Sequence, residues 1–379
     1  MIYRDFQDLK LSMLALGTMR LPIIGGDDSK INEELAQKMV DEAIEAGINY
    51  FDTAWGYHSG MSEPFIGKAL SKYNRNQFYL ATKFPGYDVS NFGKVEEIFE
   101  KQLERCRVDY FDFYLFHNVC ELNINQYLDD EQYKTYSYLI EQKKKGRIRH
   151  LGFSAHGTID TMRRFLEKYG KDMEFCQIQL NYIDWKFQDA KGKIELLKEY
   201  NLPVWVMEPV RGGKLASLDE KYMKRLKDLR PEESAPGWAF RFLQTIPGIT
   251  TILSGMSDEK QLLENIETFK EEKPLNEHEM QVLINIGDHM TNTTSLPCTA
   301  CRYCISHCPQ HLNIPYLIEL YNEHCFTVDF AFIAPMALSA MKDEEKPGAC
   351  IGCKSCEAVC PQQIKISDMM KDFDKRINA

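Results

Sequence analysis

The sequence has 379 residues, a formal net charge of −10 at pH 7 and a pI of about 5.5. This length allows one large domain and a smaller one. An acidic chain repels phosphate backbones, so we expect no nucleic-acid partner. No apolar run is long enough to span a bilayer, and the first residues, MIYRDFQDLK, lack a basic segment followed by an apolar one. We therefore expect no membrane partner and a cytoplasmic location.

The first 285 residues alternate apolar, β-rich runs with amphipathic helical stretches such as residues 31–47, 94–106 and 160–169. Eight strands separated by helices predict an α/β fold, a (β/α)8 TIM barrel over residues 1–285. An open doubly wound sheet is the alternative, although no G-x-G-x-x-G follows the first strand. The expected strands are Met13–Gly17, Asn49–Ala54, Phe78–Lys83, Phe111–His117, Ile148–Ser154, Phe175–Asn181, Val204–Glu208 and Thr251–Gly255.

The second to fifth of these strands each carry a polar or charged residue at or near their C-terminal end. Asp52 lies near the end of the second strand, and Lys83, His117 and Ser154 end the third, fourth and fifth. A TIM barrel carries its chemistry at the C-terminal ends of its strands. We therefore expect these four side chains to share one site in the barrel mouth.

Eight of the twelve cysteines fall in two runs of the same spacing, each followed by proline. Three thiolates at this spacing fit three irons of a [4Fe–4S] cubane, and the fourth cysteine then reaches the neighbouring cluster. Zinc is the alternative, but a zinc site usually takes two C-x2-C pairs. In a cytosolic chain such runs are ligands rather than disulfides. The first run is Cys298, Cys301, Cys304 and Cys308, and the second is Cys350, Cys353, Cys356 and Cys360.

These two runs predict two [4Fe–4S] clusters, each completed by the fourth cysteine of the other run. The 41 residues between Cys308 and Cys350 contain two stretches of helical pattern, 314–322 and 331–341. We therefore expect residues 286–379 to form a small, mainly α-helical dicluster ferredoxin-like domain.

The stretch Phe51-Asp52-Thr53-Ala54-Trp55-Gly56-Tyr57, followed by Ser62-Glu63, resembles the signature of the aldo-keto reductases. The resemblance spans roughly residues 10 to 270 and implies a catalytic tetrad of Asp52, Tyr57, Lys83 and His117. It continues through Ala81–Lys83, Leu115–His117, Gly152–Ser154, Gln177–Gln179, Gly255–Ser257 and Glu264–Asn265.

In such a tetrad, Tyr57 would donate a proton to the carbonyl oxygen of a small substrate while hydride reaches the carbon. A free tyrosine has a pKa near 10. We expect the Lys83 ammonium group to lower the pKa of Tyr57, and Asp52 to keep Lys83 charged. His117 would orient the carbonyl or relay the proton.

The resemblance also implies a nicotinamide cofactor, either NADP(H) or NAD(H). Ser154 and Gln177 match the residues that hold the carboxamide, and Met207 stands where an aromatic ring usually stacks on the nicotinamide. Gly255 and Gln261 stand where relatives often carry a cation for the 2′-phosphate, so the choice of cofactor stays open, with Lys260 as a possible substitute. Backbone N–H groups would receive the phosphates. The remaining candidate cofactor residues are Gly212, Gly213, Ser257 and Asn265.

A nicotinamide delivers two electrons as hydride, whereas each cluster takes one. The clusters could exchange electrons with a redox partner protein, accept an electron from a substrate radical, or act as structural staples. The sequence therefore predicts an NAD(P)(H)-dependent oxidoreductase that reduces a carbonyl or oxidises the alcohol, with two clusters for electron transfer. The alternative is a redox-sensing or electron-carrier protein whose barrel binds nucleotide without efficient turnover. The complete tetrad favours the enzyme.

Overall fold

The computed structural model describes residues 1–292, 295–298, 301–327 and 331–378. The chain divides into two compact units, Met1–Leu283 and Ile284–Ala379. This division falls within helix α13 (Glu277–Asn292). None of the described helices combines the length and the apolar character needed to cross a membrane.

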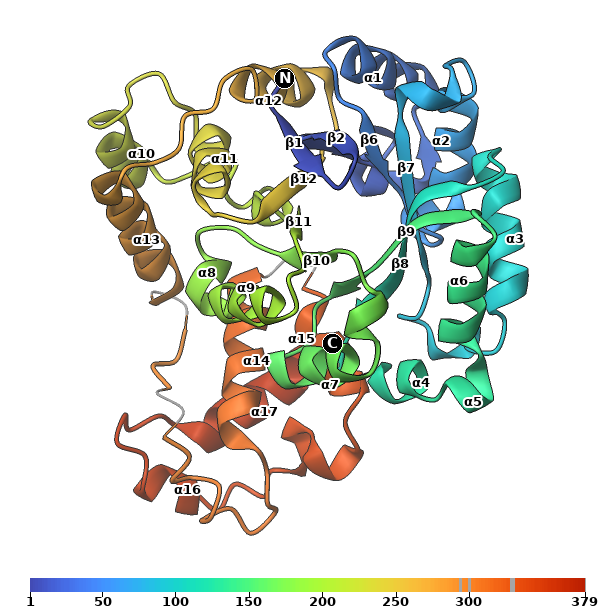
Figure 1. Ribbon diagram of the computed structural model, residues 1–379. Helices are drawn as coiled ribbons and strands as arrows, with labels where there is room; N and C mark the ends of the chain where they lie inside the picture. The colour runs from blue at the N-terminus through green and yellow to red at the C-terminus, as the bar shows by residue number, and fades with distance from the viewer. Residues whose placement is uncertain (293–294, 299–300, 328–330, 379) are drawn as a thin grey trace. The chain divides into compact units, whose positions relative to one another are not determined.

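The first unit is built on a closed barrel of eight parallel strands (Figure 1). Every predicted strand overlaps an observed one, which confirms the (β/α)8 barrel and excludes the open sheet. The strand residues are nearly all buried, as expected for parallel strands covered by helices. In barrel order the strands are β3 (Leu14–Gly17), β6 (Tyr50–Asp52), β7 (Tyr79–Phe84), β8 (Phe111–Val119), β9 (Ile148–Ala155), β10 (Cys176–Gln179), β11 (Val204–Met207) and β12 (Ile249–Gly255).

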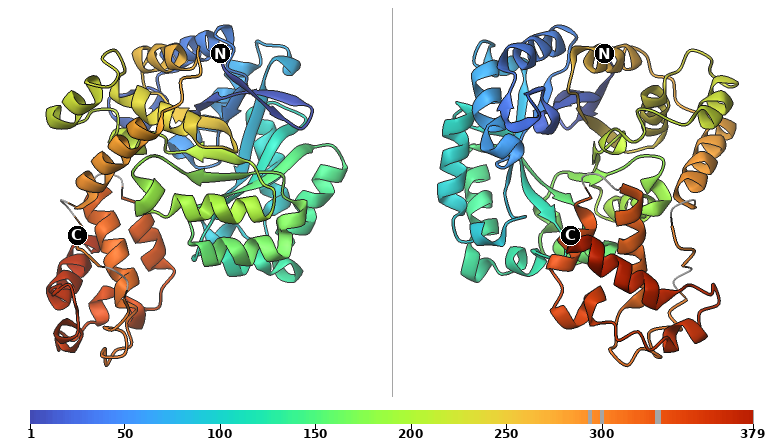
Figure 2. Two further views of the ribbon diagram at one scale, coloured as in Figure 1. Left: turned by 60° about the vertical axis from the view of Figure 1, so that its left-hand side comes forward. Right: turned by 180° about the vertical axis from the view of Figure 1, so that it is seen from behind.

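Helices connect successive strands and cover the outside of the barrel (Figures 1 and 2). In α1 (Glu33–Glu45) the buried residues, such as Ala36, Met39 and Val40, recur at helical spacing, and Asn32 caps the first turn. The other connecting helices are α2 (Ser62–Leu70), α3 (Val95–Cys106), α4 (Ile124–Leu128), α5 (Asp130–Tyr133), α6 (Thr135–Lys144), α7 (Ile159–Tyr169), α8 (Asp184–Phe187), α9 (Ala190–Glu199), α10 (Glu220–Lys227), α11 (Ala235–Thr245) and α12 (Glu259–Thr268).

A hairpin that the sequence analysis missed closes the N-terminal end of the barrel. It consists of β1 (Tyr3–Phe6) and β2 (Leu9–Ser12). The Phe6 ring packs against Trp205 and Phe113, with ring centroids 5.0 and 5.7 Å away, and both partners lie near the starts of their strands. The opposite end, where the strands finish, is therefore the one that can hold a site. A second hairpin, β4 (Ile23–Ile24) with β5 (Asp27–Ile31), follows β3.

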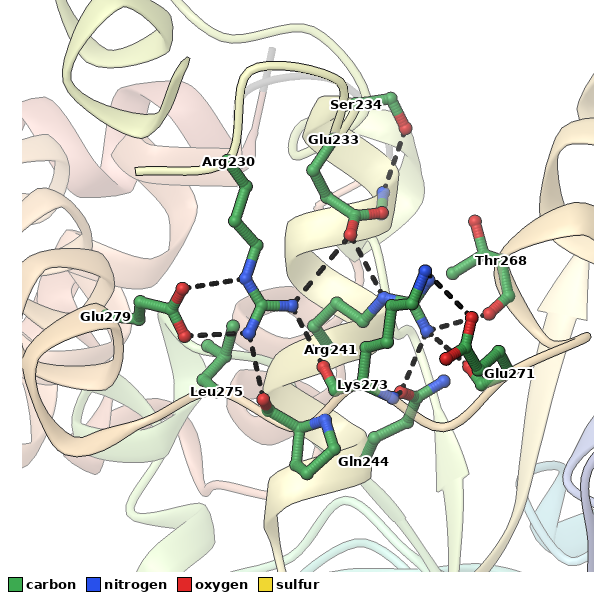
Figure 3. Close-up of polar contacts among 12 residues, drawn as sticks. Arg230, Glu233, Ser234, Arg241, Gln244, Thr268, Glu271, Lys273, Leu275 and Glu279 are labelled. Atoms are coloured by element: carbon green, nitrogen blue, oxygen red, sulfur yellow. Dashed lines mark hydrogen bonds and ion pairs between the residues drawn. The ribbon is translucent and has the colours of Figure 1, made fainter. Parts of the chain in front are cut away.

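Arg230, which is partly buried before α11, and Arg241, which is buried on α11, hold the segment after α12 and the start of α13 in place (Figure 3). Arg230 donates to both carboxylate oxygens of Glu279, at 2.7 Å each. Arg241 donates to the carbonyl oxygens of Thr268 and Glu271, at 2.8 and 2.7 Å. Arg241 is thus engaged in holding the fold together.

The second unit packs its helices around an apolar core that includes Leu317, Phe373, Cys304 and Cys356. All strands that the structure describes end by residue 255, so the described part of this unit is helical, as predicted. Its helices are α14 (Ile314–Thr327), α15 (Ile333–Ser339), α16 (Ser355–Ala358) and α17 (Ile366–Ile377).

Candidate functional site

A buried ion pair lies at the C-terminal ends of two neighbouring strands. Lys83 on β7 places its Nζ 2.6 Å from Oδ1 of Asp52, the last residue of β6, and 2.7 Å from the carbonyl oxygen of Thr53. The Lys83 side chain is 0 % exposed and that of Asp52 is 4 % exposed. Burial raises the pKa of Asp52 and lowers the pKa of Lys83, and each partner's charge opposes the shift in the other. Each charge therefore depends on the other for its stability.

Tyr57 and His117 stand beside this pair. Lys83 Nζ lies 5.2 Å from the centroid of the Tyr57 ring. The centroids of the Tyr57 and His117 rings are 6.3 Å apart, with the rings edge to face. The structure thus brings the four predicted tetrad residues together in the barrel mouth.

The turn that carries Tyr57 is held by its neighbour His58. His58 and Ser59 adopt left-handed conformations, with φ of 53° and 54°, which non-glycine residues rarely adopt without support from their surroundings. The buried His58 ring supplies that support, because its Nε2 accepts the Leu21 N–H at 3.1 Å. The position of Tyr57 therefore depends on the loop after β3.

The pKa of Tyr57 lies well above its usual value, which corrects the expected lowering by Lys83. Burial is the largest cause, and the carboxylates of Asp52 and Glu208 add to it. The Lys83 charge does not offset these effects because Asp52 balances it at 2.6 Å. At neutral pH Tyr57 is accordingly a protonated phenol.

His117 is a neutral imidazole at neutral pH. Burial, followed by the charges of Lys83 and His156, holds the pKa of His117 well below its usual range. Among the described residues, no hydrogen-bond partner contacts His117 Nδ1. A neutral ring of this kind can hydrogen-bond a carbonyl oxygen without changing the charge of the site.

A second tyrosine at the mouth, Tyr87, was missed by the sequence analysis. Its ring centroid lies 5.2 Å from that of His117, and burial raises the pKa of Tyr87 to about 12. A Cβ added to Gly56 would lie 2.3 Å from the Tyr87 hydroxyl, so only glycine permits this approach. The available signal was the position of Tyr87, four residues after Lys83 in a loop that follows a barrel strand.

The candidate residues for the nicotinamide lie on three adjacent strands. Gln177 on β10 is in register with Ser154 on β9. Gln177 Nε2 lies 3.6 Å from Sδ of Met207, at the end of β11, and Ser154 Oγ accepts the backbone N–H of Asn118 at 2.8 Å. Ser154, Gln177 and Met207 are therefore neighbours, as a shared role requires.

A cation that the sequence analysis missed lies among the candidate phosphate-binding residues. A Cβ added to Gly255 would lie 3.1 Å from Cβ of Arg20, and one added to Gly212 would lie 3.2 Å from Arg20 Nη2. Ser257 Oγ donates to the Arg20 carbonyl oxygen at 3.0 Å. Arg20 also faces Glu208, with 4.0 Å between Nη2 and Oε1. The available signal was an arginine three residues after the first barrel strand.

The N–H groups of the next loop and of the start of α12 already donate hydrogen bonds within the chain, since the Gly213 N–H donates to the Val210 carbonyl oxygen at 3.1 Å. Gly212 and Gly213 take φ of 63° and 96°, so the turn needs glycine. At α12, Gln261 Oε1 accepts the Ser257 N–H at 2.9 Å, and Asp258 caps the first turn. A phosphate bound at this helix start would displace the Gln261 side chain.

Two further candidates near α12 point away from a phosphate site. Asn265 is buried and donates to Ser254 Oγ at 3.2 Å. Lys260 is 83 % exposed and faces Glu264, with 3.7 Å between Nζ and Oε1. Asn265 therefore holds α12 against β12, and Lys260 lies in solvent.

In the second unit, the eight predicted ligands line two small pockets with empty volumes of about 310 and 330 Å³. The first pocket is lined by Cys298, Cys301, Cys304 and Cys360, and the second by Cys308, Cys350, Cys353 and Cys356. This is the exchanged grouping that the spacing predicts.

Four cysteines per pocket are the donor set that a [4Fe–4S] cluster requires. The described residues contain no three His, Cys, Asp or Glu side chains spaced for a single metal ion. A four-iron cluster needs a wider cradle, because each thiolate binds its own iron. Burial, and then the neighbouring Cys298, Cys301 and Cys360, raise the pKa of Cys304 to about 11, which indicates that the fourth cysteine is close to the other three.

The two pockets are built from an internal repeat. Each cysteine of the second run stands 52 positions after its counterpart in the first. Every residue that lines the first pocket has a counterpart 52 positions away that lines the second. The backbone repeats as well, since Arg302 and Lys354 have φ of 66° and 61°, and His311 and Gln363 have φ of 54° and 53°.

Comparison with known proteins identifies both parts of the chain. The sequence profile of the Aldo/keto reductase family matches residues 13–286, and that of the 4Fe-4S dicluster domain matches residues 297–365. An uncharacterized oxidoreductase of Bacillus subtilis, YqkF, is 27% identical over 307 residues, which are 73% of this chain and 92% of YqkF. The NADH-specific methylglyoxal reductase of Escherichia coli is 27% identical over 305 residues, 68% of this chain and 90% of that protein. The holo structure of an aldo-keto reductase from Bacillus halodurans superposes with a TM-score of 0.61 at 26% identity, over 75% of this chain and 95% of that one.

Proposed function

Because this chain belongs to the aldo/keto reductase family and carries a 4Fe–4S dicluster domain, we propose that it is an NAD(P)(H)-dependent oxidoreductase of a small carbonyl compound or the matching alcohol. The observation that carries this proposal is the position of Tyr57 beside the buried Lys83–Asp52 pair and the neutral His117. We take these four residues as the catalytic group.

Tyr57 would donate its hydroxyl proton to the substrate oxygen as negative charge develops there. Its raised pKa keeps the proton on the phenol until the substrate oxygen becomes strongly basic in the transition state. Lys83 would stabilise the phenolate that remains, and Asp52 would hold Lys83 in position. His117 would hydrogen-bond the carbonyl oxygen and orient it.

A bound nicotinamide would supply the hydride. Ser154, Gln177 and Met207 would hold its ring, and Arg20 with Gly212 and Gly213 would receive the phosphates. The Escherichia coli relative is NADH-specific, and Gly255 and Gln261 carry no charge for a 2′-phosphate, so both points favour NADH. The remaining proposed contacts are Gly255, Ser257 and Gln261, whereas Asn265 would support them by holding α12 against β12.

The two pockets would each hold one [4Fe–4S] cluster, with ligands exchanged between the two runs. Each cluster would carry one electron and exchange it with a redox partner protein or with the barrel site. The reducing conditions of the cytoplasm keep cysteine thiols available as cluster ligands, so we place the protein there.

Anaerobic assays on the full chain test the catalytic proposal. The chain is incubated with NADH or NADPH and a panel of small aldehydes, ketones and 2-oxoaldehydes, while nicotinamide absorbance and cluster EPR signals are followed together. We expect nicotinamide oxidation that depends on the carbonyl. Tight nicotinamide binding without turnover of any panel member would contradict the proposal.

The Cys308→Ser variant tests the exchanged ligation. We expect it to damage the cluster in the second pocket, because Cys308 is the fourth thiol there. Cys325→Ser, which alters a cysteine of the same unit outside both runs, is the matched control. EPR with iron counted per chain gives the result, and damage confined to the cluster of Cys298, Cys301 and Cys304 would contradict the exchange.

One observation favours the alternative of an electron carrier or redox sensor. Met207 stands where an aromatic ring usually stacks on the nicotinamide in the family, and this departure affects the residues that would position the hydride. In that case nicotinamide would bind the barrel without carbonyl turnover, and the clusters would carry the function. The assays above separate the two functions.

A further inference from the structure

The internal repeat allows the two cluster pockets to be compared position by position. Their nearest cations match. Arg302 lines the first pocket and Lys354 the second, both with left-handed backbone and both exposed. Since the two pockets receive equivalent positive charges, these cations do not make one cluster different from the other.

A carboxylate breaks this equivalence. Glu357 directly follows Cys356, whereas its counterpart 52 positions earlier, Ile305, directly follows Cys304. Ile305 packs against the apolar core of the unit. The second run therefore places a negative charge next to a cluster ligand, and the first run places an alkyl group there.

Glu357 is held in place by a residue that lines the second pocket. Its Oε1 accepts the backbone N–H of Ser367 at 2.9 Å and also the Ser367 hydroxyl. Ser367 itself lines the second pocket, and Glu357 is partly buried. A carboxylate fixed by two hydrogen bonds and partly shielded from water acts on its surroundings more strongly than a mobile surface charge.

Up to Ile318 and Met370, beyond which no residue of either repeat lines its own pocket on α14 or α17, the other charge differences have less effect. Lys365 replaces Asn313 and Asp368 replaces Tyr316, so one charge of each sign is added. Both are exposed, whereas Glu357 is partly buried. His307 and His311 in the first repeat are also exposed. Water and salt screen charges in such positions.

From these contacts we propose that Glu357 makes the cluster in the second pocket the harder of the two to reduce. Reduction adds one electron to a cluster, and a nearby negative charge disfavours that step. An electron on the second-pocket cluster would pass to the first-pocket cluster, oxidising one and reducing the other by one electron. The inference rests on the proposed binding of two clusters.

An anaerobic redox titration of the full chain with dithionite, followed by EPR, tests this order. The wild-type chain should show two separate one-electron steps. Glu357→Gln retains an oxygen that can accept the Ser367 N–H but removes the charge, so the step at lower potential should move to a more positive potential while the other stays. Ile305→Glu introduces a carboxylate at the equivalent position beside the first pocket. It should therefore move the step at higher potential, which belongs to the first-pocket cluster, to a more negative potential. Asp343→Asn, which removes an exposed carboxylate of the same unit, should move neither.

Three results would overturn the proposal. The first is a wild-type chain whose two clusters are reduced in one unresolved step. The second is a Glu357→Gln variant with full iron content and unchanged midpoint potentials. The third is a Glu357→Gln variant in which the step at higher potential shifts. If Glu357→Gln loses its iron, the Ile305→Glu variant is the remaining test. The proposal is then overturned if the step at higher potential does not move in Ile305→Glu. A wild-type chain that binds no iron fails earlier, at the proposed clusters themselves, and iron analysis distinguishes that failure from the others.

Discussion

Lys83 has no exposed surface, and its ammonium group lies between the Asp52 carboxylate and the Thr53 carbonyl oxygen. Removing one partner of such a pair leaves a buried, unpaired charge, which destabilises a protein by about 3–5 kcal/mol. Changes at Lys83 or Asp52 would therefore alter folding together with chemistry. Tyr57 is the better residue on which to test the mechanism, because its hydroxyl can be removed without leaving a charge.

We expect Tyr57→Phe to lower kcat for carbonyl reduction by about 10²–10⁴-fold, the usual contribution of a positioned proton donor. Nicotinamide affinity should stay nearly unchanged, because the hydroxyl acts in the transition state. Steady-state kinetics and titration of the bound nicotinamide's fluorescence measure the two effects. Tyr73→Phe removes a hydroxyl bonded to Asp41 outside the barrel mouth and is the matched control. Wild-type turnover in Tyr57→Phe would show that another group donates the proton.

Arg20 should set the affinity for the cofactor's phosphates. A hydrogen bond to a charged group contributes about 1.5–3 kcal/mol, so Arg20→Gln should weaken NADH binding by roughly 10- to 100-fold. NADH should bind at least as well as NADPH, because Gly255 and Gln261 offer no charge to a 2′-phosphate. Calorimetric titration with both nucleotides checks both points, with Arg163→Gln on the barrel exterior as the control. A hundredfold preference for NADPH would contradict the second point, and its loss in Arg20→Gln would identify Arg20 as the cation for the 2′-phosphate.

The strand ends predicted Asp52, Lys83 and His117, because each is a polar residue that closes or nearly closes an apolar run, whereas Tyr57 was predicted only by the family resemblance. The same reasoning could not find Arg20, whose neighbours Gly212 and Gly255 lie about two hundred residues later in the chain. Nor could it give the pKa of Tyr57. That value depends on burial and on Glu208, which only the folded barrel brings near.

At the scale of elements, the N-terminal hairpin is held to the barrel by Glu174, the second residue before β10. Gln7 in the hairpin turn donates to Glu174 Oε2 at 2.7 Å, and His150 on β9 contacts the same oxygen at 2.8 Å. Lys143 of α6 pairs with the other oxygen. One carboxylate thus joins the hairpin, a strand and a helix at the closed end of the barrel.

These contacts predict how stability depends on pH. Burial alone would raise the pKa of Glu174, but His150, Lys143 and Gln7 outweigh it and lower the pKa to about 2. The unfolded chain has the higher pKa, so this stabilisation is complete above about pH 4.5 and is lost as the pH falls towards 2. Glu174→Gln should lower the free energy of unfolding at pH 7 by up to about 3 kcal/mol, and the difference from wild type should shrink below pH 4.5.

Urea unfolding at a series of pH values measures this effect. The control is Glu199→Gln, which removes an exposed carboxylate that pairs with Arg163 and should change stability little. A stability difference between Glu174→Gln and wild type that stays constant down to pH 2 would show that the carboxylate's charge is not the cause.

The barrel strands were predictable because apolar, β-rich runs recur between amphipathic helices. The hairpins were not, because β1 reads Tyr-Arg-Asp-Phe and shows three of its four side chains at least partly to solvent. Its role comes from Phe6, which is buried only because Trp205 and Phe113 lie at the same end of the barrel. The helical character of the second unit was predictable from the length and pattern of the insertion between the cysteine runs.

At the scale of the whole molecule, the two units have separate cores. The core of the second unit includes Cys304 and Cys356, so the proposed clusters would be part of what holds that unit folded. The hairpin and the eight strands close the first unit without any of those cysteines. Loss of iron should therefore affect the two units differently.

We expect calorimetry of the full chain with iron to show unfolding of both units. Chelation of the iron under anaerobic conditions should abolish the transition of the second unit and leave that of the barrel within a few degrees of its original temperature. Nicotinamide binding, followed by fluorescence, should persist in the iron-free chain. An iron-free chain whose barrel transition also disappears would mean that the clusters stabilise both units.

The exchange of cysteines between the repeats also sets when the clusters can form during synthesis. A chain is made from its N-terminus, so residues 1–283 are synthesised before any of the eight cysteines, and the second run follows well after those residues. The second pocket gains its last thiol at Cys356 and the first pocket at Cys360, although three of the first pocket's thiols are made more than fifty residues earlier. A translation product that stops before the second repeat therefore fills neither pocket, and iron would be loaded only near the end of synthesis, onto a chain whose barrel is already in place.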